Sequence, residues 1–292
     1  MFAVVGTVPD EDFPIVAGPV SAAGDRVLID GREIEVNRGT AALLAAAVMV
    51  SHYMGKDGPD AFLVGDTGYG RGSRRLYEYL EKTLPARRYS SLTFHYIQPD
   101  VDWHNRVLFA VDQMPERPLL IADAGFMYAA KMSGQAEAYD AFTPDIGELA
   151  FLADESAPHP FYTRGFILHE NSRAAPLIER AYRHKNAARY LLVKGEKDIA
   201  ADRSGILETV TEPRTDALEA IGGTGDIITG LLAGLTGVGQ DLLPSVMAAI
   251  RISRMAGQAA APNPGTQVAE IIQKIPDCLK QFYDKGHPTG SP

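Results

Sequence analysis

The stretch Gly222-Gly-Thr-Gly-Asp226 combines residue types that could bind an anion and move a proton. Glycines permit the positive φ angles of a tight turn and let the backbone approach a ligand closely. A helical pattern follows from Asp226 to about Leu235, so free backbone N–H groups of the turn and the helix start would form an anion site. The helix dipole favours a carboxylate there, and Asp226 could serve as a general base. The alternative is a plain turn and helix cap, which ordinarily needs only one glycine or threonine.

Asp145 and Glu148 are a second candidate, because carboxylates three positions apart on the first turn of a helix share one face. Residues 144–148 open a predicted helix that continues through Leu152. Carboxylate oxygens near a phosphate suit Mg²⁺, which usually binds one or two carboxylates together with waters and phosphates. Acidic residues also favour helix N-termini without any metal. Both interpretations are open at this point.

Lys194 closes an apolar run, residues 190–193, and precedes Gly195. A lysine at the end of a strand could place its charge on a nucleotide phosphate, although most lysines are solvated surface residues. The histidines show no spacing typical of metal ligands, and they are His52, His95, His104, His159, His169, His184 and His287. We therefore assign no histidine a role from the sequence.

The elements that must position these residues alternate along the chain. Apolar runs alternate with helical patterns of about 10–15 residues, which is typical of βαβ units and a parallel sheet. The predicted strands are residues 2–5, 61–64, 92–97, 118–121, a short segment at 139–143, 190–193 and an edge-like segment at 205–210. The predicted helices are residues 39–54, 72–84, 102–114, 144–152, 174–184, 226–235, 243–260 and 268–282. Asp30-Gly31, between two apolar runs, predicts a hairpin.

Four segments lie at the C-terminal ends of predicted strands: residues 65–70, Asp123, Lys194 with Gly195, and residues 222–226. The first of these is a second glycine-rich loop. Parallel strands end at the same edge of a sheet, and open α/β sheets bind ligands at that edge. We therefore expect the four segments to converge on one ligand site.

Packing patterns predict a buried helix and a close helix contact. The pattern at residues 39–54 is apolar nearly all round, so this helix should be buried. Gly230, Gly234 and Gly237 fall on one helix face, which predicts close packing against a neighbour. No linker or shift in composition divides the chain, so we expect a single domain over residues 1–292. Residues 153–166 are the expected long loop and could serve as a lid.

Composition narrows the class of protein. The chain has 292 residues, of which 46% are hydrophobic and 22% charged, as in ordinary globular proteins. A net charge of −9 argues against a nucleic-acid surface, which needs clustered lysine and arginine. Cys278 is the only cysteine, which excludes an internal disulfide and a cysteine-rich metal site. The N-terminus lacks the pattern of a signal peptide, and the longest apolar run, residues 41–50, is too short to cross a membrane. We expect a cytoplasmic enzyme.

With these residues in view, the chain resembles the ribokinase-like superfamily and is most similar to its ADP- or ATP-dependent NAD(P)H-hydrate dehydratase family. Gly39-Thr-Ala-Ala-Leu-Leu-Ala-Ala-Ala47 looks like that family's first buried helix. Thr143-Pro-Asp-Ile-Gly-Glu148 is similar to its Thr-Pro-His-x-Gly-Glu motif. Leu192-Val-Lys-Gly195 resembles its Leu-Lys-Gly strand end, and Gly222-Gly-Thr-Gly-Asp226 is similar to its anion-hole and catalytic motif. The likeness covers roughly residues 39–275.

The resemblance implies a three-layer α/β/α fold with a central, mostly parallel sheet, a homo-oligomer, and ATP or ADP with Mg²⁺ as cofactors. The epimerase domain that is often fused to this family is not expected here. It implies that Asp226 deprotonates the hydroxyl of hydrated NAD(P)H, that the transferring phosphoryl group meets the glycine-rich loop, and that phosphate is then eliminated. The expected catalytic residues are Asp226, Gly223, Thr224 and Gly225. The expected nucleotide-binding residues are Lys194, Gly195, Glu196, Lys197 and Asp198 with Gly222 and Gly225. The resemblance places Ala41, Gly68 and Asp145 at the substrate, and Gly65, Asp123 and Asp226 complete the expected substrate set. The expected metal ligands are Asp145 and Glu148.

Departures from the family pattern cluster on the acceptor side. Asp145 stands where the family has histidine and recreates the Asn/Asp-x-x-Glu metal pattern of sugar and vitamin kinases. Asp66-Thr67 interrupts the family's Gly-Pro-Gly, and Asp123-Ala-Gly125 replaces its Asp-x-Asp or Asp-Gly. A dehydratase is the first hypothesis. A small-molecule kinase acting on a sugar or on the hydroxymethyl group of a vitamin precursor is the second. A nucleotide-binding protein without turnover is the third, against which Asp226 argues, because binding alone needs no base.

Overall fold

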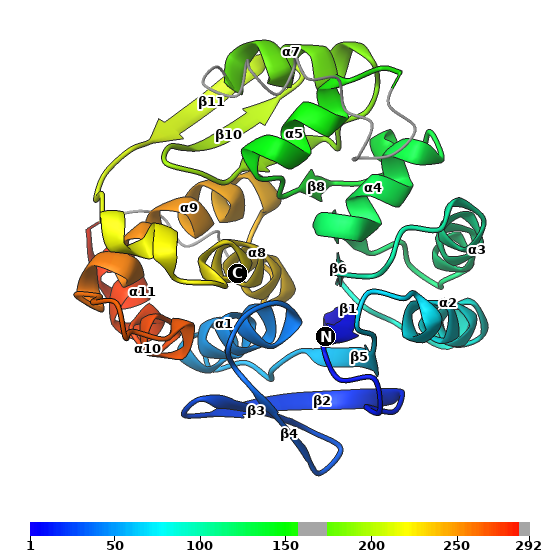
Figure 1. The fold of residues 1–292 in the computed structure, drawn as a ribbon, viewed down its shortest axis with the longest axis horizontal. Coiled ribbons are helices and arrows are strands. Elements are labelled where there is room, and N and C mark those ends of the chain that lie inside the picture. Colours follow the sequence, from blue (N-terminus) through cyan, green and yellow to red (C-terminus); the bar gives the residue numbers. More distant parts are fainter. Residues whose placement is uncertain (157–173, 286–292) are drawn as a thin grey trace.

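In the computed structural model, which describes residues 1–156 and 174–285, the strands form one eleven-stranded sheet in the order β11-β10-β9-β8-β7-β6-β1-β5-β2-β3-β4 (Figure 1). The six central strands are parallel, and they are β1 (Ala3–Val8), β5 (Asp60–Gly65), β6 (Ser91–His95), β7 (Leu119–Ala122), β8 (Ala141–Phe142) and β9 (Tyr190–Val193). The antiparallel flanks are β10 (Asp198–Asp202) with β11 (Gly205–Val210), and β2 (Val16–Ala23) with β3 (Arg26–Ile29) and β4 (Arg32–Glu35).

Helices cover both faces of this sheet. One layer holds α1 (Thr40–Tyr53), α8 (Thr224–Gly237), α9 (Leu242–Ala259), α10 (Val268–Ile272) and α11 (Ile275–Asp284). The other holds α2 (Arg71–Thr83), α3 (Val101–Asp112), α4 (Ala124–Met132), α5 (Ile146–Ala153) and α7 (Ala174–Arg183). Because side chains alternate along a strand, Val4 of β1 packs with the first layer, and Ala3 and Val5 pack with the second. The predicted three-layer arrangement with a mostly parallel central sheet is confirmed. None of the described helices is long and apolar enough to cross a membrane.

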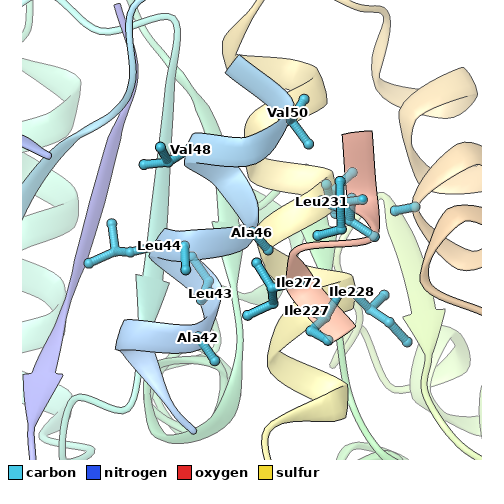
Figure 2. Packing of buried hydrophobic residues seen from close by; sticks show 14 of the residues in the cluster. Ala42, Leu43, Leu44, Ala46, Val48, Val50, Ile227, Ile228, Leu231 and Ile272 are labelled. Carbon is cyan, nitrogen blue, oxygen red and sulfur yellow. The ribbon is translucent and has the colours of Figure 1, made fainter. Parts of the chain in front are cut away.

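The buried helix α1 packs closely on α8, as Figure 2 shows for Leu43, Ala46 and Leu231. A Cβ added to Gly230 would lie 2.3 Å from the carbonyl oxygen of Leu43. A Cβ on Gly234 would lie 2.8 Å from Cβ of Val50. Glycines therefore let the two backbones approach, and both predictions for these helices are confirmed. This contact joins the start of the chain to its C-terminal third.

The predicted hairpin is also present, and it extends the sheet. Strands β3 and β4 pair around Asp30 and Gly31, whose φ angles of 49° and 71° are both positive, as a two-residue type I′ turn requires. In β2, residues 16–19 pair with β5 and residues 20–23 pair with β3. The hairpin thus continues the sheet beyond β5.

Several elements differ from the sequence prediction. Strands β2 and β10 and helix α4 were not anticipated, because β10 is built largely from alanine and aspartate and because α4 begins immediately after Asp123. The single helix predicted over residues 268–282 is wrong. It is divided into α10 and α11, and Pro276 lies in the first turn of α11, where its missing N–H is tolerated. Most of the loop predicted at 153–166 lies outside the described residues.

Candidate active site

Three distant segments meet at the carboxylate of Asp226. Asp226 lies in the first turn of α8 and is 7% exposed. Its Oδ2 accepts a hydrogen bond of 2.6 Å from the N–H of Gly39, which precedes α1. Its Oδ1 lies 3.1 Å from Nε2 of His95, at the end of β6. The close packing of α1 on α8 therefore fixes this carboxylate relative to the central sheet.

His95 is fully buried and links Asp226 to Thr40. Its Nδ1 lies 3.0 Å from Oγ1 of Thr40. An ionised carboxylate only accepts hydrogen bonds, so a neutral His95 donates from Nε2 to Asp226 and accepts at Nδ1 from Thr40. The sequence analysis missed His95. Its one signal was its position at the carboxyl end of a strand, at the same edge as Asp123 and Lys194.

Asp123 and Lys194 form a buried ion pair next to His95. Nζ of Lys194 lies 3.0 and 2.8 Å from the two carboxylate oxygens of Asp123. The hydroxyl of Thr229 donates to Asp123 at 2.6 Å, and the N–H of Ala124 donates at 2.8 Å. Burial alone would raise the pKa of Asp123, but the charge of Lys194 and the hydrogen bonds from Lys194 and Thr229 hold that pKa below its usual value. Burial opposes the charge of Lys194 as well, but Asp123 and Glu148 outweigh it and raise the pKa of the lysine. Both members of the pair are therefore charged at neutral pH.

Within residues 1–156 and 174–285, His95, Asp123 and Asp226 form the one group of three side chains close enough to share a metal ion. Nε2 of His95 lies 3.7 Å from Oδ2 of Asp123. Lys194 already supplies the positive charge to Asp123, and a divalent cation would stand beside its ammonium group. The geometry favours a lysine-neutralised cluster over a metal at this position.

Asp145 and Glu148 close a capping box at the start of α5. Oδ1 of Asp145 accepts the N–H of Glu148 at 2.7 Å, and Oε2 of Glu148 accepts the N–H of Asp145 at 2.8 Å. The hydroxyl of Tyr128 donates to Oε1 of Glu148 at 2.9 Å. Burial, together with repulsion from Asp123, raises the pKa of Glu148 to about 7, although Lys194 acts to lower it. The two carboxylates therefore cap the start of α5, as acidic residues at a helix N-terminus often do. The side chain of Asp145 is exposed.

These groups line one cavity of about 520 Å³. Its walls include Tyr96, His95, Asp123, Asp145, Glu148, Lys194, Gly195, Glu196, Asp198, Gly223, Thr224, Gly225, Asp226 and Arg254. The cavity therefore brings together most of the residues proposed from the sequence. Those that do not line it are Ala41, Gly65, Gly68, Lys197 and Gly222.

The glycine-rich loop at residues 65–70 lies apart from this cavity. A Cβ on Gly65 would lie 1.8 Å from the carbonyl oxygen of Asp10, and Gly68 lines a separate hollow beside Gln98. Asp66 fills the loop itself, because its carboxylate accepts the N–H groups of Gly68, Gly70 and Ser73. Burial acts to raise the pKa of Asp66, but these bonds hold it below its usual value. The loop follows a parallel strand as expected, but its N–H groups bind an internal carboxylate instead of facing the cavity.

Arg254 organises the turn that follows Lys194. It is buried on α9, and its Nε lies 2.7 Å from Oδ2 of Asp198. Its guanidinium also donates to the carbonyl groups of Glu196, at 2.6 Å, and Thr211, at 2.9 Å. Oδ1 of Asp198 accepts the N–H of Gly195. The sequence analysis missed Arg254, because an arginine within a long helix carries no local motif.

Helix α8 begins at the cavity without a capping side chain. Its N-cap is Gly223, with φ of 94° and, within the described part of the chain, no side-chain hydrogen bond to the cap. In contrast, Asp100, Asp123 and Asp145 cap α3, α4 and α5. The first N–H groups of α8 are therefore available for an anion.

Three relatives match this chain in sequence, and they include the following two proteins. An uncharacterised protein of Methanocaldococcus jannaschii is 36% identical over 82% of this chain and 98% of its own length. The ADP-dependent (S)-NAD(P)H-hydrate dehydratase of Cenarchaeum symbiosum is 28% identical over 48% of this chain and 44% of its own length. The alignment with this named enzyme therefore covers less than half of either protein.

Solved structures and a family model agree with the fold. The ADP/ATP-dependent NAD(P)H-hydrate dehydratase of Bacillus subtilis, co-crystallised with ATP and Mg²⁺, superposes with a TM-score of 0.55 and 16% identity, over 96% of this chain and 89% of that one. A ribokinase-like superfamily protein of Enterococcus faecalis superposes with a TM-score of 0.56 and 13% identity, over 96% and 87%. At these identities the likeness shows the ribokinase-like fold. The model of the NAD(P)H-hydrate dehydratase family matches residues 100–277, and this chain belongs to that family.

Proposed function

We propose that this protein is a nucleotide-dependent NAD(P)H-hydrate dehydratase. The observation that carries the proposal is the uncapped start of α8, which opens on a cavity lined by Lys194 and places Asp226 beside the free N–H groups. An anion site next to a carboxylate is what phosphoryl transfer to a hydroxyl requires. The ADP-dependent relative and the neighbour co-crystallised with ATP and Mg²⁺ support ADP or ATP as the donor.

In the proposed reaction the nucleotide lies between the turn at residues 194–198 and the start of α8. Asp226 takes the proton of the substrate hydroxyl, whose oxygen forms a bond to the γ-phosphorus of ATP or the β-phosphorus of ADP. The bond from that phosphorus to the bridging oxygen breaks, and ADP or AMP leaves with the electron pair. The N–H groups of Gly223, Thr224 and Gly225 stabilise the charge on the transferring group. The C–O bond of the phosphorylated substrate then breaks, and phosphate leaves with the electron pair. Loss of a proton from the adjacent ring carbon restores the double bond of the dihydronicotinamide.

Asp145 and Glu148 are the residues that would hold Mg²⁺. Both line the cavity with Lys194 and Asp226. Oδ2 of Asp145 lies outside the capping box, and Oε1 of Glu148 accepts the hydroxyl of Tyr128. Oxygen donors of this kind fit Mg²⁺, which binds through one or two carboxylates and the nucleotide phosphates. The ion would supply charge neutralisation of the phosphates. This chain's own part is to keep the two side chains fixed through Tyr128 and the helix start.

The experiment is an incubation of the purified protein with hydrated NADH, Mg²⁺ and either ATP or ADP, following the return of NADH absorbance. We expect absorbance to recover with one nucleotide and inorganic phosphate to accumulate with it. No recovery by a protein that binds ADP or ATP would remove the dehydratase proposal.

A small-molecule kinase is the second candidate, and one observation favours it. Asp145 stands where the family motif has histidine, and Asp145 with Glu148 gives the metal pattern of sugar and vitamin kinases. Mass spectrometry separates the two activities, because a kinase leaves a phosphorylated product and a dehydratase leaves free phosphate with NAD(P)H. A protein that binds nucleotide and consumes no acceptor would support the third hypothesis, a nucleotide-binding protein without turnover.

A further inference from the structure

Tyr96 is a large aromatic residue that the fold holds in an exposed position at some energetic cost. Its side chain follows β6 and is 51% exposed, although cores usually bury such rings. Its φ of 52° lies in the left-handed region, which is unfavourable for a residue with a bulky side chain. Oγ1 of Thr7 donates to the carbonyl oxygen of Tyr96 at 2.8 Å and holds this conformation. Backbone strain of this kind, beside a cavity, indicates a function for the ring.

The ring of Tyr96 borders the proposed base. It lies edge-on to the ring of His95, with centroids 4.3 Å apart, and lines the cavity with Asp226. A Cβ on Gly39 would lie 3.5 Å from the Tyr96 ring, and the N–H of Gly39 holds Asp226. Burial first, and then the charge of Asp226, raise the pKa of Tyr96 to about 12, so the phenol is neutral at physiological pH. An uncharged flat face therefore adjoins the carboxylate.

This face lies on the acceptor side of the cavity. Tyr96 follows β6 and Lys194 follows β9, and strands β7 and β8 lie between β6 and β9. Three strand spacings separate the two positions by about 14 Å along the sheet. A nucleotide at the Lys194 turn with its terminal phosphate at α8 leaves the Tyr96 side for the molecule that receives the phosphoryl group.

Arg38 places a positive charge beside Gly222 and Gly223, and Gly223 lines the cavity. A Cβ on Gly223 would lie 3.0 Å from Cα of Arg38, and a Cβ on Gly222 would lie 3.8 Å from its Cδ, so the arginine runs along the glycine-rich loop. Arg38 is exposed, and its guanidinium makes no ion pair with any residue of 1–156 or 174–285. It is adjacent in sequence to Gly39. A cation in this position can bind an anionic group of the acceptor.

We propose that Tyr96 and Arg38 form an acceptor subsite, in which the Tyr96 ring stacks on the reduced nicotinamide ring and Arg38 binds the phosphate attached to its ribose. This inference rests on the proposed function and specifies how the dihydronicotinamide end of its product is recognised. Tyr96, after β6, would recognise the ring, and Arg38, before α1, would recognise the phosphate charge. A sugar phosphate would use Arg38 and gain little from the aromatic face.

The test measures binding of reduced nicotinamide mononucleotide, which carries the ring and one phosphate but no adenine. Binding is detected by the fluorescence of the mononucleotide in the presence of saturating ADP. The variants are Tyr96→Leu, Tyr96→Phe and Arg38→Gln. The control variants are Phe109→Leu, an exposed aromatic residue on α3, and Arg88→Gln, an exposed arginine before β6. Retained ADP binding shows that each variant is folded.

We expect Tyr96→Leu to weaken binding of the mononucleotide about 10-fold, since stacking on an aromatic side chain is worth about 5- to 150-fold. Tyr96→Phe should stay within about 3-fold of the unmodified protein, because it keeps the ring. Arg38→Gln should also weaken the mononucleotide about 10-fold, because it removes one charge-assisted contact, and both controls should leave binding unchanged.

Absence of saturable binding to the unmodified protein, or equal binding by Tyr96→Leu, would overturn the subsite. If Arg38→Gln loses binding of the mononucleotide and Tyr96→Leu does not, the stacking assignment would also be overturned. The outcome is separable from the proposed function. If the protein does not dehydrate hydrated NADH but the variants bind the mononucleotide as expected, the subsite is supported and the proposed activity is refuted. If the protein dehydrates hydrated NADH but the variants do not bind as expected, the activity is supported and the subsite is refuted.

Discussion

At the scale of single residues, Asp226 gains its position from two neighbours that differ in kind. The N–H of Gly39 comes from the backbone, and Nε2 of His95 comes from a buried side chain. Both stabilise the carboxylate without neutralising it with a full positive charge. Lys194 pairs with Asp123 instead, which leaves Asp226 free to accept a proton from a substrate.

Asp226→Asn tests this role. The amide keeps the size of the side chain and an oxygen acceptor for Gly39, but it cannot take a proton. We expect turnover to fall by about 10²- to 10⁴-fold, the usual effect of losing a general base. Steady-state kinetics and calorimetric titration with ADP measure the two quantities. Nucleotide affinity should be nearly unchanged, and turnover equal to that of the unmodified protein would refute the assigned role.

His104 predicts how stability depends on pH. It is fully buried on α3, with Nε2 2.8 Å from the hydroxyl of Tyr139 and Nδ1 3.1 Å from Oγ of Ser133. Burial lowers the pKa of His104 to about 4. The unfolded chain binds a proton near pH 6.5 and the folded chain does not, so stability is complete above that pH and is lost as pH falls towards 4.

We expect this residue to cost up to about 3 kcal/mol of unfolding free energy between pH 6.5 and pH 4. In His104→Gln, denaturant unfolding at several pH values should show a smaller loss over that interval. His52→Gln, at an exposed histidine of α1, is the matched control and should follow the unmodified protein. Parallel curves for His104→Gln and the unmodified protein would contradict the prediction.

The sequence was informative where function depends on a local motif. Residues 222–226 and Lys194 with Gly195 carry their chemistry in consecutive positions, so their grouping in one cavity was predictable from strand ends. His95, Tyr96 and Arg254 could not be identified, because their importance comes from contacts made by distant segments. The loop at 65–70 has a local motif, but contacts within the loop give that motif a different role from the one expected. Its glycines match an anion loop, but Asp66 returns to fill it.

At the scale of elements, the cavity depends on how α9 secures the turn between β9 and β10. Arg254 bonds Asp198 and the carbonyl groups of Glu196 and Thr211, so one helix position restrains the start of β10 and the end of β11. Burial raises the pKa of Asp198, although Arg254 acts to lower it. The buried pair of Arg254 and Asp198 therefore restrains the turn that carries Lys194.

We therefore expect Arg254→Gln to weaken nucleotide binding by about 10-fold or more, and to destabilise the protein by about 3–5 kcal/mol through the unpaired Asp198. Adding Asp198→Asn removes that charge. The double variant should regain stability while nucleotide affinity stays low, because the carbonyl contacts are still missing. Calorimetric titration and denaturant unfolding separate the two effects.

Arg251→Gln is the matched control for this prediction, because Arg251 lies one turn away on α9 and pairs with Glu208 of β11. It should leave nucleotide affinity unchanged. Recovery of both affinity and stability in the double variant would show that Arg254 acts only through the charge of Asp198.

At the scale of the whole molecule, the site draws on both halves of the chain. Gly39 and His95 come from the first hundred residues, and Lys194, Asp226 and Arg254 come from the last hundred. One continuous sheet and the α1–α8 contact join these halves. We propose on this basis that the chain is a single domain, and that ligand binding and global stability are coupled.

The last prediction concerns that coupling. In scanning calorimetry the protein should unfold in one transition, because no part of the sheet can separate without exposing the core on both faces. ADP at about 100 times its dissociation constant should stabilise the folded state by about 2.7 kcal/mol and raise the midpoint by about 5 °C. Asp226→Asn should keep this shift, and Arg254→Gln, with about 10-fold weaker binding, should lose about half of it at the same ADP concentration. Two resolved transitions, with only one displaced by ADP, would mean that the antiparallel flank at β2–β4 or the helices α10 and α11 unfold independently of the site.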